Sequence, residues 1–105
     1  MKWYISGKIT DLPTDHVIAK FKQAEQQIMA FGHEPVNPLK NGLDMESHWN
    51  SHLIADIALL LECDAIYLLS DWKDSKGARI EANIAEECGL QIVHQPEYAT
   101  YESRI

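Results

Sequence analysis

The sequence predicts an α/β fold, a three-layer sandwich of about four parallel strands with helices on both faces. Short stretches rich in aromatic and β-branched residues alternate along the chain with longer segments of helical periodicity. This strict alternation indicates parallel strands joined by right-handed crossovers. In addition, the strand candidate DAIYLL (64–69) is apolar throughout, which is typical of a strand covered on both faces.

The first half of the chain contains two strand candidates and one helix candidate. The first strand, KWYIS (2–6), stops at Gly7. A helix then begins near an N-cap candidate, Thr14 or Asp15, and ends at Gly32, the kind of residue that follows a helix. Its apolar stripe consists of Val17, Phe21, Ala24 and Ile28. A weak second strand follows at 33–38, which Pro35 restricts to an edge or a short piece.

The second half completes the alternating pattern. We expect in order a loop, an apolar helix, the strand DAIYLL, a third helix and a fourth strand, at residues 39–48, 49–62, 64–69, 74–90 and 90–94. The result is a flavodoxin/Rossmann-like sheet, in which ligands bind beyond the carboxyl ends of the strands, where the strand order reverses. That edge carries residues 6–11, the loop after Val36 and residues 70–77, so Ser6, Gly7 and Lys8 are substrate-binding candidates.

Composition restricts the class of protein. The length of 105 residues predicts a single domain at 1–105, and 46% hydrophobic with 24% charged residues is ordinary for a globular protein. A net charge of −7 without a basic cluster argues against a nucleic-acid polymer as partner. No apolar run reaches membrane length, so we expect no membrane partner and a cytoplasmic protein. Cys63 and Cys88 lie on apolar helix faces and are expected to be small buried hydrophobes.

Two acidic residues interrupt apolar helix faces. Glu81 falls near the middle of the apolar stripe of the third helix, and Asp56 does the same on the second helix. An ionised carboxylate buried without partners costs several kcal/mol, so such an acid has a raised pKa or a specific partner. Either acid could instead reach solvent or accept hydrogen bonds from a neighbouring turn. Because the two helices can converge on the ligand edge, both acids are candidates for catalysis.

The start of the third helix is a candidate anion site. Ser75 can cap the helix, and free N–H groups there can hold a phosphate, although a plain N-cap also explains the serine. Gly77 costs helix stability, roughly 1 kcal/mol against Ala, unless a ligand or the backbone needs the space. Gly7 is explained equally by a tight turn or by a ligand packed against it.

The histidines do not predict a metal site. His48 and His52 stand four apart near a helix start, but the run HWNSH lacks the glutamate of zinc proteases and a third ligand. No glycine-rich cofactor motif is present either, so we expect neither a metal nor a cofactor.

Three segments, YISGKITDLP, DIALLLECDAIYLLSDW and SKGARIEANIAEECGL, resemble the nucleoside 2-deoxyribosyltransferase-like superfamily, and most of all a small bacterial and phage branch of unassigned function. The resemblance runs from Tyr4 to about Val93. It implies that Glu81 is the nucleophile that attacks C1′ of a deoxynucleoside and that Asp56 handles and protonates the base. It also implies that Tyr4 positions the nucleophile.

Two departures from the superfamily pattern bear on the substrate. Ser75 stands where the transferases have an aspartate that binds the sugar hydroxyls, and it resembles the branch that hydrolyses 2′-deoxynucleoside 5′-phosphates. Lys8 stands where relatives have proline, and it could face a phosphate or be solvated. The expected partner is therefore a small nucleoside or nucleotide.

We expect an N-glycosidase or deoxyribosyltransferase-like enzyme. The alternatives are a non-catalytic nucleotide-binding or sensing domain, and a small acidic interaction protein, which would not explain the two acids. The resemblance also implies a homodimer or homotetramer, in which Tyr98 and Tyr101 of the tail could complete a neighbouring pocket; a frayed terminus explains the tail equally well.

Overall fold

A computed structural model describes residues 1–44 and 46–96 of the chain. Its strands are β1 (Lys2–Ser6), β2 (Glu34–Val36), β3 (Ala65–Leu68) and β4 (Gln91–His94). Its α-helices are α1 (Thr14–Ala30), α2 (Trp49–Leu60) and α3 (Lys76–Glu87), and two 3₁₀ turns are η1 (Pro38–Lys40) and η2 (Trp72–Asp74). Strands and helices therefore alternate as the sequence predicts.

The four strands form one parallel sheet in the order β2-β1-β3-β4. The chain moves from β1 outward to β2 and then back across to β3, so the strand order reverses between β1 and β3. This flavodoxin/Rossmann-like arrangement confirms the predicted fold class. Its switch point lies at the carboxyl ends of the two central strands, where such sheets bind ligands.

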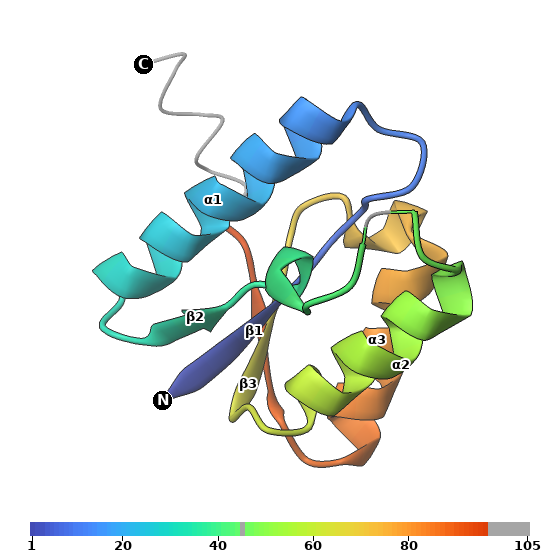
Figure 1. The fold of residues 1–105 in the computed structure, drawn as a ribbon. Helices are drawn as coiled ribbons and strands as arrows, with labels where there is room; N and C mark the ends of the chain where they lie inside the picture. The colour runs from blue at the N-terminus through green and yellow to red at the C-terminus, as the bar shows by residue number, and fades with distance from the viewer. Residues whose placement is uncertain (45, 97–105) are drawn as a thin grey trace.

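Helices cover both faces of the sheet (Figure 1). The stripe of α1 packs against Trp3 and Ile5 of β1 and Tyr67 of β3 on one face. On the other face, Leu60 of α2 and Ala85 of α3 pack against the neighbouring residues of the same strands, Tyr4, Ile66 and Leu68. Because successive side chains of a strand point to opposite faces, β1 turns Tyr4 and Ser6 together toward α2 and α3.

Local details correct several expectations. Neither Thr14 nor Asp15 caps α1, because the helix begins at Thr14 after Pro13, without a side-chain cap. Gly32 has a φ of +87°, the left-handed conformation expected after a helix. Cys63 is buried, and burial raises the pKa of its thiol to about 11, but Cys88 at the end of α3 is exposed. Tyr98 and Tyr101 lie outside the described residues.

No helix in residues 1–44 and 46–96 is long and apolar enough to cross a membrane.

Candidate active site at the carboxyl edge of the sheet

A cavity of about 570 Å³ opens at the carboxyl ends of β1 and β3. Its volume lies within the range of small-molecule sites, about 300–1,000 Å³. Four segments line it: the β1–α1 loop from Gly7 to Asp11, the loop at η1, the inward side of α2 and the first turns of α3. The loop residues and the start of α3 are therefore at the ligand edge that the strand order predicts.

Glu81 lies in the wall of this cavity, with 6% of its surface exposed. Its carboxylate accepts hydrogen bonds from the Tyr4 hydroxyl (2.9 Å) and the Ser6 hydroxyl (2.7 Å). Both donors come from the face of β1 on which α3 packs, so alternation along the strand places them together. Burial raises the pKa of Glu81 to about 7, although the two hydroxyls oppose that rise.

Asp56 also lines the cavity, from α2, and is 8% exposed. Burial raises the pKa of Asp56, while a hydrogen bond from the Asn41 amide (2.9 Å) and the nearby His52 oppose the rise. The charge of Asp56 in turn contributes to the raised pKa of Glu81, so the two acids act on one another. The structure thus brings the two misplaced acids of the sequence to one cavity.

Tyr4 itself does not line the cavity but stands behind Glu81. Burial, followed by the charges of Glu81 and Asp56, raises the pKa of Tyr4 well above its ordinary value. The phenol therefore keeps its proton and remains a donor to the carboxylate.

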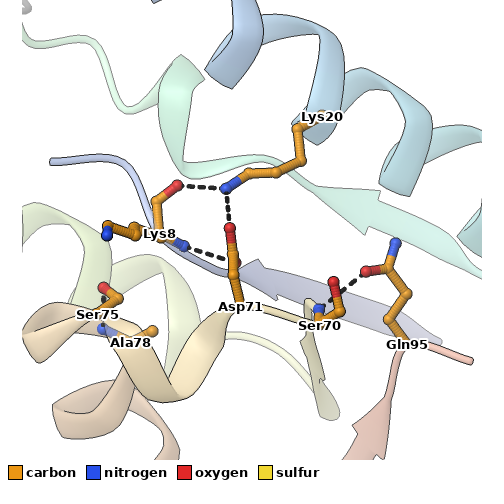
Figure 2. Close-up of polar contacts among 7 residues, drawn as sticks. All are labelled: Lys8, Lys20, Ser70, Asp71, Ser75, Ala78 and Gln95. Atoms are coloured by element: carbon orange, nitrogen blue, oxygen red, sulfur yellow. Dashed lines mark hydrogen bonds and ion pairs between the residues drawn. The ribbon is translucent and has the colours of Figure 1, made fainter. Parts of the chain in front are cut away.

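The start of α3 presents backbone donors to the same cavity. Ser75 caps the helix, since its hydroxyl accepts from the Ala78 N–H at 3.1 Å (Figure 2). The first N–H groups of every helix lack an intrahelical acceptor, and the Ser75 hydroxyl satisfies one of them. The N–H groups of Lys76 and Gly77, also in the first turn, are left to bind a ligand or solvent. Gly77 has room for a side chain: an added Cβ would lie 3.8 Å from the Trp49 ring. This is an ordinary van der Waals distance, so the glycine does not relieve a clash.

Position 7 is a glycine for a different reason. A Cβ at Gly7 would lie 2.6 Å from Cδ1 and 2.9 Å from Cβ of Leu69, so the Leu69 side chain occupies the space that a side chain at position 7 would need. The close approach of Leu69 explains this glycine, while Gly7 still lines the cavity.

Lys8 is fixed through its backbone (Figure 2). Its N–H donates to Asp71 (3.1 Å), and its carbonyl accepts from Lys20, which also pairs with Asp71 at 2.6 Å. Lys20 and Asp71 thus tie the β1–α1 loop to the loop after β3. Because the Lys8 N–H is occupied, it is not a free anion donor in this arrangement.

Sequence reasoning missed Lys20, Asp71 and Asn41. Lys20 belongs to the amphipathic α1 and Asn41 to a loop, and neither interrupts a periodic pattern that would single it out. The two histidines have structural contacts: His48 caps α2 by accepting from the Asn50 N–H, and His52 bonds to the preceding loop. Residues 1–44 and 46–96 contain no group of three or more His, Cys, Asp or Glu placed to hold a metal ion.

The family model described as Domain of unknown function (DUF4406) matches residues 1–94. Among solved structures, the protein named 2-desoxiribosyltransferase from Leishmania mexicana superposes with a TM-score of 0.68 at 18% identity, covering 99% of this chain and 73% of that chain. A search of curated protein sequences finds no match. The likeness confirms the resemblance inferred from the sequence at the level of the fold.

Proposed function

The chain belongs to the family described as Domain of unknown function (DUF4406), and we propose that it cleaves the N-glycosidic bond of a small nucleoside or (deoxy)nucleoside 5′-phosphate. The observation that carries the proposal is the setting of Glu81, a buried carboxylate held by two hydroxyl donors in the wall of a cavity that Asp56 also lines. Cleavage of such a bond needs a carboxylate at the sugar and an acid at the leaving base.

In the proposed reaction, the ionised Glu81 carboxylate attacks C1′ of the sugar. The bond from C1′ to the base nitrogen breaks, its electron pair leaves with the base, and Asp56 supplies the proton that the base takes up. The sugar remains as an ester on Glu81 until water, in hydrolysis, or a second base, in transfer, displaces it. Tyr4 and Ser6 hold the carboxylate in place from behind.

The protonation states that the reaction needs predict its pH dependence. Glu81 must be ionised and Asp56 protonated, yet burial raises the pKa of both, to about 7 for Glu81. The rate should therefore follow a bell-shaped pH profile, whose two limbs belong to the coupled pair rather than to either residue alone.

The start of α3 supports a phosphorylated substrate. The N–H groups of Lys76 and Gly77 and the positive end of the helix dipole suit a 5′-phosphate, and Gly77 leaves the space that it would fill. The fold shared with a protein named as a 2-deoxyribosyltransferase supports the same class of reaction.

The competing function is a non-catalytic nucleotide-binding or sensing domain. The raised pKa of Glu81, about 7, favours it, because a large fraction of the proposed nucleophile is then neutral near neutral pH.

In either case we expect a homodimer or homotetramer, since Ile54 (70% exposed) and Leu61 (50% exposed) turn an apolar face of α2 outward. Light scattering after size exclusion measures that state, and a monomer at all concentrations would contradict it.

One assay separates the two functions. The protein is incubated with a panel of deoxynucleosides and their 5′-monophosphates, with and without a second free base, and released base is measured by chromatography. We expect release from at least one substrate, loss of release in Glu81→Gln, and normal release in Glu86→Gln, which removes an exposed carboxylate from the same helix. Tight binding without release would support the sensing domain, and full release by Glu81→Gln would refute the assignment of the nucleophile.

A further inference from the structure

The side-chain amide of Asn41 is fully engaged although it lines the cavity. Its oxygen accepts from the Leu43 N–H (2.9 Å), which fixes the orientation of the amide because a backbone N–H can only donate. Its nitrogen therefore faces the two other partners, Asp56 Oδ1 at 2.9 Å and His52 Nδ1 at 3.1 Å. With both N–H groups used, Asn41 has no donor left for a ligand.

The orientation of Asn41 determines the tautomer of His52. Because the amide nitrogen only donates, Nδ1 of His52 must be the acceptor, and the ring proton sits on Nε2. Nε2 lies 2.9 Å from the Asp44 carbonyl oxygen, which only accepts, so the contacts of both ring nitrogens indicate the same tautomer. His52 thus holds Asn41 from one side and the loop from the other.

The same contacts distinguish the two oxygens of Asp56. Oδ1 is occupied by the Asn41 donor, whereas Oδ2 has no hydrogen-bond partner within residues 1–44 and 46–96. The proton of a neutral Asp56 therefore belongs on Oδ2, because Oδ1 already receives a donor.

We infer that Asn41 and His52 are positioning residues that hold Asp56 by Oδ1 and leave Oδ2 to deliver the proton to the departing base. This inference rests on the proposed function for its role and on the contacts of Asn41 for its geometry. In the step itself, the proton moves from Oδ2 to the base nitrogen while the C1′–N electron pair goes to the base. The Asp56 carboxylate that remains is then stabilised by the Asn41 donor.

The titratable groups that act around Asp56 come from three elements. His52 lies on its own helix α2, Glu81 lies on α3, and Tyr4 lies on β1. The Tyr4 hydroxyl donates a hydrogen bond to Glu81, whereas the Asn41 amide donates to Asp56 and contacts neither of those two residues through a hydrogen bond. Replacing Asn41 should therefore change the titration of Asp56 directly.

Carboxyl-carbon NMR titration of the free protein tests the inference without a substrate. Asn41→Ala should raise the pKa of Asp56 by about half a pH unit or more, because the donor to its charged form is lost. His52→Leu should act in the same direction, and His52→Gln, which keeps an acceptor for Asn41 but not the charge of the ring, should bring the titration back toward that of the wild type. Asn50→Ala, on the exposed first turn of α2, is the matched control and should change nothing.

The outcomes are decisive in each case. An Asp56 that titrates in Asn41→Ala as in the wild type would overturn the inference, and equal effects of His52→Leu and His52→Gln would remove His52 from it. If thermal melting shows that Asn41→Ala does not fold, His52→Leu decides instead, because it removes the acceptor that holds Asn41, and an unchanged Asp56 pKa there would equally overturn the inference. Where base release is found, its pH profile should differ between Asn41→Ala and the wild type; without base release the proposed function fails, while the NMR result still decides the geometry.

Discussion

Replacing Glu81 by glutamine should stabilise the protein in alkaline solution and much less in acid. Burial raises the pKa of Glu81 from its ordinary 4.5 to about 7, so the folded protein keeps this proton over a range in which the unfolded chain releases it. The stability linked to this proton is fully present below pH 4.5 and is lost as the pH rises through about 7. The full loss is roughly 3 kcal/mol.

The Glu81→Gln variant removes this loss. The glutamine side chain has the size of the acid, stays neutral at every pH, and can bond to both hydroxyls, of Tyr4 and Ser6. Urea unfolding at about pH 5 and about pH 8.5 gives the free energy of unfolding of both proteins. The advantage of Glu81→Gln should grow by roughly 2–3 kcal/mol between the two conditions.

The matched control is Glu86→Gln, an exposed acid on the same helix, whose stability should run parallel to that of the wild type. An advantage of Glu81→Gln that is the same at both pH values would show that burial does not raise the pKa of Glu81, and the proposed electrostatics of the site would be wrong.

Three further substitutions test the surroundings of the cavity. Gly7→Ala should destabilise by about 1–3 kcal/mol in urea unfolding, because its Cβ would lie 2.6 Å from a Leu69 carbon; unchanged stability would contradict this packing. Gly77→Ala should leave the fold as stable or up to about 1 kcal/mol more stable while weakening the binding of a nucleoside 5′-phosphate in calorimetry, and equal affinity would refute the phosphate site. Lys20→Met should cost about 1–2 kcal/mol of stability, because it leaves the partly buried Asp71 without its cationic partner, and a neutral effect in thermal melting would contradict the tie between the loops.

The sequence was informative wherever a periodic pattern was interrupted. Glu81 and Asp56 stand out because each breaks an apolar helix stripe, and both prove to be buried beside one cavity. The fold class was predictable for a similar reason, since alternating strands and helices leave few possible topologies. Ser75 was predictable as a cap from local chemistry alone.

Contacts between distant segments were not predictable in this way. Asn41 lies in a loop, and nothing local indicates that its amide meets Asp56 and His52 of α2. The clash that explains Gly7 depends on Leu69, which is far along the chain and becomes a neighbour only when β1 and β3 pair. Cys88 was misjudged because it follows the last turn of α3, where the apolar face is no longer covered.

The central claim, that Glu81 is a nucleophile, is tested most directly by mass spectrometry of the protein quenched in acid during turnover of a deoxynucleoside 5′-monophosphate. Peptide mapping should locate a sugar-phosphate adduct on the peptide that contains Glu81, and the adduct should be absent from Glu81→Gln. Base release by the wild type with no adduct on Glu81, or with the adduct on another residue, would contradict the account.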